Sequence, residues 1–273
     1  IATAELAIAD TTLRVGRYRA FLAQSLERFA EAIEAYEFIV ERATDDFEAW
    51  KNLGNARSGI EDHAGAIAAL ERAVALDPRA APARLNLAAA YRAADRSEDA
   101  EAALRQAAED FPQDARPLHQ LYLFHKTALR QDEAVAALEA AVARDPVNAD
   151  YQLKLAIEYG VMRKSREAEA AYRRAIELDP GQIDAYIGLA IQFEHTNRED
   201  EFAPLIALAR ANTIADGPLA LIEALELRRL EQFEAALAQL TRVPPETEPV
   251  RTVHIRGTLL ERLHRTDEAF AAY

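Results

Sequence analysis

The chain has 273 residues, half of them apolar, with only 9 glycines and 11 prolines, which is the composition of a folded, helix-rich protein rather than a disordered or collagen-like one. Its 32 basic and 46 acidic residues give a net charge of -14, which repels phosphate backbones and anionic lipid, so we expect neither nucleic acid nor a membrane as a partner. The absence of cysteine excludes disulfides, thiolate nucleophiles and cysteine-based zinc sites.

One pattern recurs along the chain every 34 residues. The series consists of alanines with a single exception and runs Ala32, Ala66, Ala100, Ala134, Ala168, Phe202 and Ala236. This period is typical of pairs of short helices that cannot bury their own apolar faces and therefore stack. It predicts an all-α fold, a right-handed α-solenoid of about eight helical hairpins with a long concave surface.

The first elements depart from this repeat. Residues 1–12 are predicted to be an N-terminal extension or cap, and the first unit, 13–46, carries Arg19 where leucine is usual. Residues 1–12 lack an initiator methionine and the order of a secretory signal, so we expect the chain to begin inside a longer protein. We predict a cytoplasmic location.

The clearest unit is 47–80, which reads FEAWKNLGNARSGIEDHAGAIAALERAVALDPRA. Trp50, Leu53 and Gly54 are three and four residues apart, so they form one contact stripe on the first helix. Gly54 and Ala66 are small where the two helices of the hairpin are expected to cross. With these residues the unit resembles the tetratricopeptide repeat, and only Arg57 replaces a tyrosine that is usual in that family.

Helix stops follow the same period. Proline lacks an amide hydrogen and disfavours helical geometry in the residue before it, so Asp77-Pro78 ends the second helix of its unit. The stop recurs three times, as Phe111-Pro112, Asp145-Pro146 and Asp179-Pro180. These stops define units at 47–80, 81–114, 115–148 and 149–182.

The C-terminal units are less regular. Ala215-Asp216-Gly217-Pro218 and Val243-Pro244-Pro245 replace the earlier stops, so we expect altered stacking after residue 209. The units there are predicted at 183–216, 217–249 and 250–273. The last unit ends at Tyr273 without a polar capping repeat, from which we expect the natural protein to continue.

The resemblance implies that the first helix of each unit lines the concave groove. At one end the positions are polar and resemble the carboxylate clamp of chaperone-binding tetratricopeptide domains, which grips the terminal carboxylate of a peptide. These positions are Lys51, Asn55, Asn86, Arg116 and Gln120. Gln120 departs from the clamp, because a cation is usual there. A generic polar groove is the alternative interpretation.

From the fourth unit onward the corresponding positions are apolar: Leu123, Leu153, Ile157, Ile187 and Ile191, followed by Leu221 and Leu225. A contiguous apolar track of this kind indicates an interaction surface that receives an amphipathic helix or an extended peptide. Alternatively, tight stacking buries these side chains against neighbouring helices. The sequence alone does not decide between the two.

No set of residues predicts catalysis. The six histidines lack metal-ligand spacing, and the chain has no glycine-rich phosphate loop and no nucleophile elbow. We therefore expect no catalytic residue, no cofactor and no metal, and we do not expect this chain to be an enzyme. The question stays open for a longer parent protein.

A second resemblance concerns the segment from Phe193 onward, which includes ALELRRLEQFEAALAQL and RGTLLERLHRTDEAFAAY. It looks like the repeat region that precedes the catalytic domain in bacterial tetratricopeptide sulfotransferase-family proteins. Such membership would imply a further domain that uses the sulfate donor PAPS. The shortage of lysine, with 28 of the 32 basic residues being arginine, also favours a bacterial source.

Two functions follow as hypotheses. The first is a scaffold or adaptor that holds a protein or peptide in the concave groove. The alternative is the non-catalytic repeat segment of a larger sulfotransferase-family enzyme, presenting an acceptor to a catalytic domain outside this chain. Partner identity and oligomeric state do not follow from the sequence.

Overall fold

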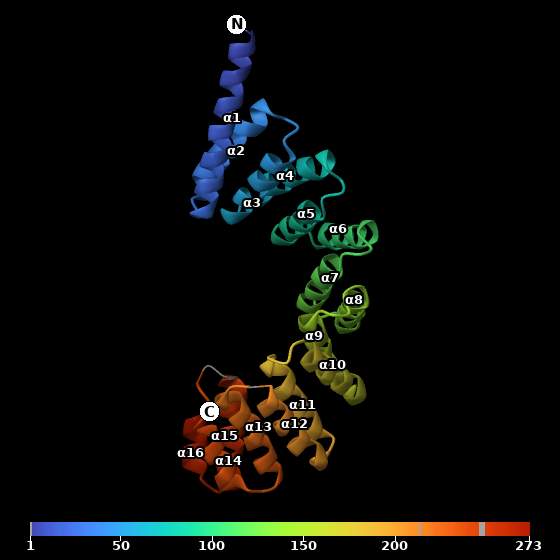
Figure 1. Ribbon diagram of the computed structural model, residues 1–273, viewed down its shortest axis with the longest axis vertical. Coiled ribbons are helices and arrows are strands. Elements are labelled where there is room, and N and C mark those ends of the chain that lie inside the picture. The colour runs from blue at the N-terminus through green and yellow to red at the C-terminus, as the bar shows by residue number, and fades with distance from the viewer. Residues whose placement is uncertain (1, 213, 246–248) are drawn as a thin grey trace. The chain divides into compact units, whose positions relative to one another are not determined.

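Helices are the regular elements of the chain (Figure 1). The computed structural model describes residues 2–212, 214–245 and 249–273, and the side chains of these residues except 2–11, 199, 249 and 251. In chain order the helices are α1 (Ala2–Ser25), α2 (Phe29–Arg42), α3 (Phe47–Gly59), α4 (His63–Leu76), α5 (Ala81–Ala93), α6 (Ser97–Asp110), α7 (Arg116–Thr127), α8 (Gln131–Arg144), α9 (Ala149–Val161), α10 (Ser165–Leu178), α11 (Ile183–His195), the 3-10 helix η1 (Glu199–Glu201), α12 (Phe202–Ala211), α13 (Asp216–Arg229), α14 (Phe233–Leu240), α15 (Pro249–Arg262) and α16 (Thr266–Ala272).

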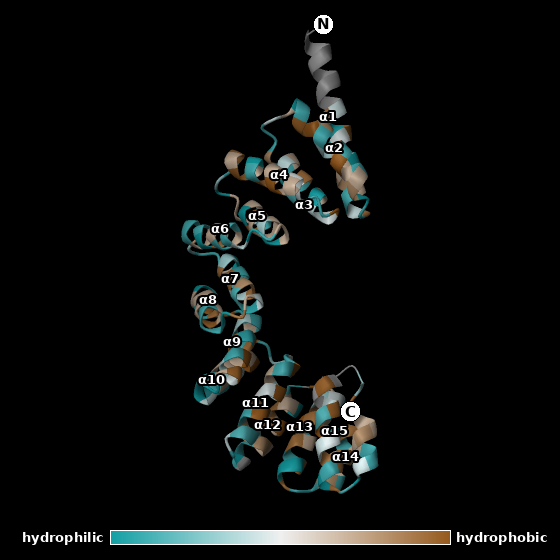
Figure 2. Ribbon diagram, turned by 180° about the vertical axis from the view of Figure 1, so that it is seen from behind, coloured by the Kyte–Doolittle hydropathy of each residue, from teal (hydrophilic) through white to brown (hydrophobic). Residues whose placement is uncertain are grey.

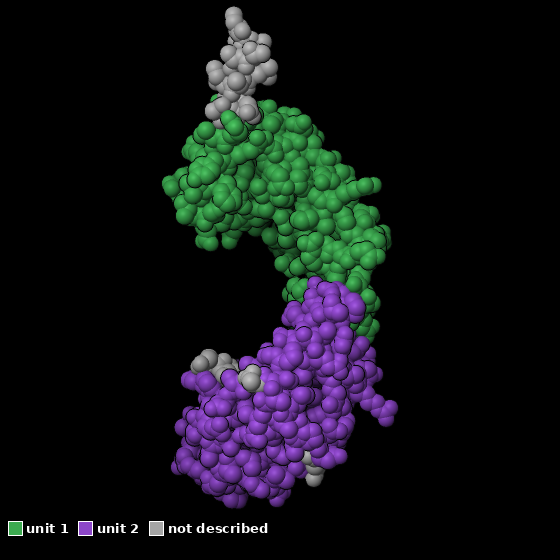
Figure 3. Space-filling model, in the orientation of Figure 1, with its two compact units in different colours: residues 1–144 green, residues 145–273 purple. Residues whose placement is uncertain are grey.

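The chain divides into two compact units, residues 1–144 and 145–273 (Figure 3). We call them unit 1 and unit 2 and describe each by itself. Unit 1 contains the hairpins α1–α2, α3–α4, α5–α6 and α7–α8, and unit 2 contains α9–α10, α11–α12, α13–α14 and α15–α16. Within unit 1 the second helix of each hairpin also packs on the first helix of the next. The hairpins therefore stack as the sequence predicted.

The turn inside every hairpin contains one residue with positive φ. These residues have φ between 53° and 61° and are Glu27, Glu61, Asp95, Leu129, Arg163, Asn197, Glu231 and His264. The backbone N–H of the residue after it donates a hydrogen bond to a carbonyl oxygen near the end of the first helix. In the hairpin α5–α6, for example, the N–H of Arg96 donates to the carbonyl oxygen of Tyr91 at 2.9 Å. This pattern closes an α-helix and begins the return segment after a very short connection.

Ion pairs join neighbouring hairpins at the same turns. Arg130, which follows Leu129, donates from Nη2 to Oε2 of Glu101 in the preceding hairpin at 2.7 Å. Arg198 makes the equivalent bond from Nη1 to Oε2 of Glu169 at 2.5 Å. The Glu101 carboxylate is mostly buried, and its pKa is lowered chiefly by the hydrogen bond from Arg130. Charge-assisted bonds of this kind hold successive hairpins in register.

Small residues allow the helices to cross closely. A Cβ atom on Gly54 would lie 2.5 Å from Cγ of Leu70 and 3.2 Å from the Ala66 carbonyl oxygen. The periodic alanines from Ala32 to Ala236 are completely buried. Apolar and polar residues alternate along the helices in Figure 2, as expected for helices that bury one face. The prediction that Gly54 and Ala66 are small because they lie at a crossing is confirmed.

The ends and the irregular region differ from the regular repeat. Helix α1 begins at Ala2 and continues without a break past residue 13, so residues 2–12 extend the first helix; Ile1 lies outside the described residues. In unit 2, η1 precedes a short α12 of 10 residues, and α11 packs directly on α13. Asp216 and Pro218 belong to the first turn of α13, where proline needs no amide hydrogen.

We expect Leu129→Gly to stabilise unit 1. Leu129 is exposed and has φ of 57°, a region in which a side chain costs about 1–2 kcal/mol. Glycine removes that cost but gives the unfolded chain more freedom, so the net gain in the free energy of unfolding is about 0.5–1 kcal/mol. Chemical denaturation measures it. Val147→Gly, at an exposed turn residue without positive φ, is the control and should not stabilise the protein.

We expect Glu101→Gln to change the acid sensitivity of the protein. Because the folded-state pKa of Glu101 is lowered, its contribution to stability is present above the unfolded pKa of about 4.3 and is lost as the pH falls through the folded pKa. The variant should therefore be less stable than wild type by about 1–3 kcal/mol at pH 6, and the difference should shrink towards pH 3. Denaturation at both pH values tests this; Glu109→Gln, on the exposed side of α6, is the control.

Candidate peptide-binding surfaces

Two asparagines from adjacent first helices meet in unit 1. Asn55 lies on α3 and Asn86 on α5, and Nδ2 of Asn86 donates to Oδ1 of Asn55 at 2.8 Å. Both side chains are half-buried. The other amide atoms, Nδ2 of Asn55 and Oδ1 of Asn86, have no hydrogen-bond partner within the described residues. The pair therefore has one donor and one acceptor available to a ligand.

The two predicted cations are already paired. Nζ of Lys51 lies 2.6 Å from Oε2 of Glu48, one turn earlier on α3. Nη2 of Arg116 lies 2.7 Å from Oδ2 of Asp114, and this hydrogen bond is the main reason why the pKa of Asp114 is lowered. One partner of each pair is exposed, namely Glu48 and Arg116, so a ligand carboxylate can compete with Glu48 or Asp114 for the cation.

The two remaining positions on α7 are less accessible. Gln120 is half-buried and lines a small cleft with Leu85 of α5 and Phe124 of its own helix. Leu123 is also half-buried. The structure thus brings Asn55 and Asn86 into contact, places Lys51 one turn from Asn55, and leaves Arg116 and Gln120 on the next first helix.

The apolar positions of unit 2 do not form a continuous exposed track. Ile187 is fully buried and Leu153 is buried in the same apolar core, while Ile191 is partly buried against it. Ile157 is 40% exposed. Leu221 and Leu225 are also buried. The direct packing of α11 on α13 supplies the physical reason, since it covers the face that carries Ile187.

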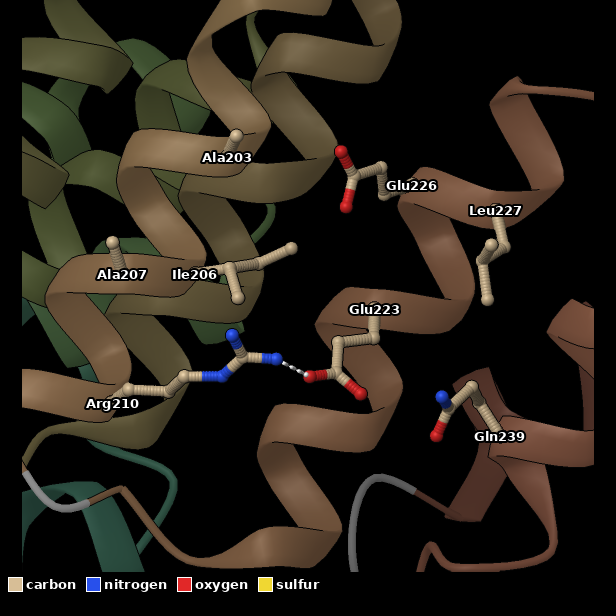
Figure 4. Close-up of a pocket in the computed structure, with 8 residues that line it drawn as sticks. All are labelled: Ala203, Ile206, Ala207, Arg210, Glu223, Glu226, Leu227 and Gln239. Carbon is tan, nitrogen blue, oxygen red and sulfur yellow. Dashed lines mark hydrogen bonds and ion pairs between the residues drawn. The ribbon is translucent and has the colours of Figure 1, made fainter.

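A cavity that the sequence did not suggest lies between α12 and α13 (Figure 4). Its volume is about 370 Å³, and its lining residues are Ala203, Ile206, Ala207, Arg210, Glu223, Glu226, Leu227 and Gln239. Nη2 of Arg210 reaches across the cavity to Oε1 of Glu223 at 2.6 Å. The cavity depends on the spacing of two helices, which no local pattern encodes. In the sequence, only the irregular helix stop at Ala215–Pro218 indicated that the packing in this region departs from the regular repeat.

The described residues contain no group of three histidine, aspartate or glutamate side chains that could hold a metal ion. His125 is buried on α7, with Nε2 4.0 Å from Oε1 of Glu101. Burial lowers the pKa of His125, so the ring is neutral near pH 7. The same ring packs edge-on against the ring of Phe124. Its role is consistent with packing.

Membrane insertion through a helix has no support in the parts of the chain that the structure describes. No helix there combines the length and the apolar character needed to cross a bilayer.

Comparison with known proteins identifies the repeats. Residues 61–122 and residues 153–216 each match a family described as tetratricopeptide repeat. One match lies in each unit. A search of curated proteins finds no match to the sequence.

Three solved structures show the same fold. A tetratricopeptide repeat protein from Parabacteroides merdae is 12% identical with a TM-score of 0.54, and the match covers 92% of this chain and 99% of that one. The Pseudomonas aeruginosa protein pilF is 18% identical with a TM-score of 0.52, over 83% and 97% of the two chains. YrrB, titled a TPR protein with an unusual peptide-binding site, is 18% identical with a TM-score of 0.50, over 67% and 94%.

These comparisons confirm the all-α fold of stacked tetratricopeptide hairpins. Both family matches are to tetratricopeptide repeats and neither extends beyond residue 216, so the resemblance of the segment from Phe193 onward to sulfotransferase-family proteins stays a prediction.

We expect Ile187 and Ile157 to respond very differently to aspartate. Ile187→Asp buries an unpaired charge and should destabilise unit 2 by more than about 3 kcal/mol. Ile157→Asp keeps its charge in contact with water and should cost about 1 kcal/mol at most. Far-UV circular dichroism with chemical denaturation measures both. Equal losses for the two variants would contradict the difference in burial described above.

Proposed function

We propose that this chain is a protein-interaction scaffold that binds an extended peptide segment on the first-helix surface of unit 1. The observation that carries the proposal is the hydrogen-bonded pair Asn55–Asn86, which leaves one donor and one acceptor available on neighbouring helices. An extended peptide backbone carries both kinds of group, and a side-chain amide can satisfy either. Recognition would thus depend on the peptide backbone rather than on one side chain.

The cations beside the pair add a preference for a negative ligand group. Lys51 lies one helical turn from Asn55, and Arg116 lies on the next first helix. A terminal carboxylate or an acidic side chain of the ligand would exchange with Glu48 or Asp114. Gln120 would contribute a neutral hydrogen bond. Charge-assisted bonds to the cations are stronger than neutral ones, so an acidic ligand end would set the binding direction.

Unit 2 would supply apolar contacts at few positions. Of Leu153, Ile157, Ile187 and Ile191, the side chain that a partner can reach most readily is Ile157. Ile191 is the next most accessible. We therefore include these two residues, and not Ile187, in a second partner contact.

A peptide-binding role is supported by likeness as well as by geometry. YrrB shares the fold, and its title describes a peptide-binding site in that protein. Stacked helical hairpins offer long surfaces that are commonly used to bind other proteins. A cytoplasmic location stays a prediction.

The second candidate is the non-catalytic repeat segment of a larger sulfotransferase-family enzyme. Its support is the resemblance of the tail, which folds here into helical hairpins ending with α15 and α16. In that case the asparagine pair would present an acceptor peptide. Assaying the intact parent protein for sulfate transfer from PAPS tests this candidate, and absence of transfer would remove it.

We expect the double substitution Asn55→Ala and Asn86→Ala to weaken peptide binding at least about fivefold, because each lost hydrogen bond contributes about 0.5–1.5 kcal/mol. The probe is a library of ten-residue peptides with free C-terminal carboxylates, and the strongest binder is then measured by fluorescence anisotropy. Gln106→Ala, on the second helix α6, is the matched control and should bind as wild type does.

The same peptide with an amidated C-terminus separates the two parts of the site. The asparagine substitutions should weaken both peptide forms, whereas Lys51→Ala with Arg116→Ala should weaken the carboxylate form more than the amidated form. Undiminished binding by the asparagine double variant would overturn the proposed site.

A further inference from the structure

A polar cleft in unit 2 lies where the turn between α9 and α10 meets the end of α11. Its volume is about 420 Å³, and its lining residues are Gly160, Val161, Arg163, Ser165, Gln192 and His195. Among the described residues of this lining there is an arginine but no carboxylate. The cleft is therefore suited to a ligand that accepts hydrogen bonds and carries negative charge.

Gln192 of α11 supplies a buried amide to this cleft. The residue is 7% exposed, and its side-chain amide has no hydrogen-bond partner within the described residues. The same place in the repeat holds Ala56, Ala90 and Phe124, which are buried apolar residues. A buried polar group without a partner is costly, so a ligand in the cleft that accepts a hydrogen bond from this amide would offset the cost.

The absence of a side chain at Gly160 opens the cleft beside the amide. A Cβ atom on Gly160 would lie 3.1 Å from Nε2 of Gln192. Elsewhere in the array the same place holds a residue with a side chain, namely Ser58, Arg92, Lys126, Glu194 and Arg228. Glycine therefore leaves room for a ligand next to the amide nitrogen, which can donate to a ligand oxygen.

The turn that forms another wall of the cleft is basic. Arg163, Lys164 and Arg166 flank Ser165, and all three are exposed and have no ion-pair partner within the part of the chain that the structure describes. Arg163 stands at the left-handed position of its turn, where four other hairpins carry an acidic residue. This segment is thus locally positive in a chain with a net charge of -14, and it attracts an anion to the cleft.

The first turn of α10 adds uncharged donors. Ser165 lines the cleft and is the first residue of this 14-residue helix, and the preceding residue, Lys164, does not cap the helix with its side chain. The backbone N–H groups of the first turn can therefore donate to a ligand, and the helix dipole favours negative charge at this end. Glu167 belongs to the same turn but does not line the cleft.

We propose that this cleft binds a phosphoryl group. The guanidinium of Arg163, the hydroxyl of Ser165 and the amide of Gln192 come from a turn and two helices, so they can donate to different oxygens of one tetrahedral group. A carboxylate has two oxygens in one plane and would leave part of this donor set unused. The cleft is larger than one phosphate ion, so part of the molecule that carries the phosphoryl group also fits. The site lies within unit 2 and does not depend on the peptide site proposed for unit 1.

Titration with a phosphorylated peptide tests the proposal. The probe is a short peptide of glycines around one phosphoserine, with acetylated and amidated ends, so it offers no terminal carboxylate to the asparagine pair of unit 1. Isothermal titration calorimetry at low salt should show saturable one-to-one binding by wild type. The same peptide with glutamate in place of phosphoserine should bind at least about tenfold more weakly, because it loses charge-assisted hydrogen bonds.

Two substitutions in the cleft should each weaken binding of the phosphoserine peptide at least about tenfold: Arg163→Asn removes the cation, and Gln192→Glu replaces a donor by a negative charge. Asn197 has positive φ in the next hairpin, and Glu158 is buried at the place of Gln192 in the preceding first helix, so both variants should keep the helical spectrum of wild type. Arg79→Asn removes an exposed arginine in unit 1 and should bind as wild type does.

Inorganic phosphate is the second probe and identifies the source of the phosphoryl group. Binding of phosphate and peptide with similar affinity would indicate a free phosphate or a small phosphorylated molecule, and clearly tighter binding of the peptide would indicate a phosphorylated protein segment. Absence of saturable binding of both probes, equal binding of the glutamate peptide, or undiminished binding by either cleft variant would each overturn the proposal.

Discussion

The turn inside each hairpin holds one residue in the left-handed region of backbone conformation, and the stacking of the hairpins within each unit depends on that constraint. At these eight positions φ lies between 53° and 61°, and none of them is glycine. The amide that follows returns to the first helix, so the second helix starts with the same offset every time. That offset places a buried alanine or Phe202 at each crossing. Side chains in the left-handed region cost about 1–2 kcal/mol each, which the packing of the helices offsets.

The same turns connect hairpin to hairpin. A basic residue follows the left-handed residue in most hairpins, namely Arg28, Arg96, Arg130, Lys164, Arg198 and Arg265. Arg130 and Arg198 reach a glutamate of the preceding hairpin. One short segment thus ends a helix, reverses the chain and ties two repeats together. Asn55 and Asn86 also come within hydrogen-bond distance although they belong to different hairpins, and there the turn residue Arg96 bonds to Asp99 of its own hairpin.

Equivalent positions have different environments in the two units. Asn55 of unit 1 and Ile191 of unit 2 share one place in the repeat, as do Lys51 and Ile187. In unit 1 the first helices leave these side chains partly accessible, and they are polar. In unit 2, α11 packs on α13, and Ile187 becomes part of the core. A repeat position therefore does not have a fixed role, because its exposure depends on how closely the neighbouring hairpins approach.

The amino-acid sequence by itself determined the repeat, the helices and their crossings. The 34-residue period, the small residues Gly54 and Ala66, and the Asp-Pro stops are local features, since helix formation and helix termination depend on residues within a few turns of one another. The sequence also nominated Lys51, Asn55 and Asn86 from their places in the repeat. Tertiary structure decided that the asparagines bond to each other and that Ile187 is buried. Those outcomes depend on the distance between helices that are far apart in the chain, and a periodic pattern records which face a residue occupies but not what comes to cover that face.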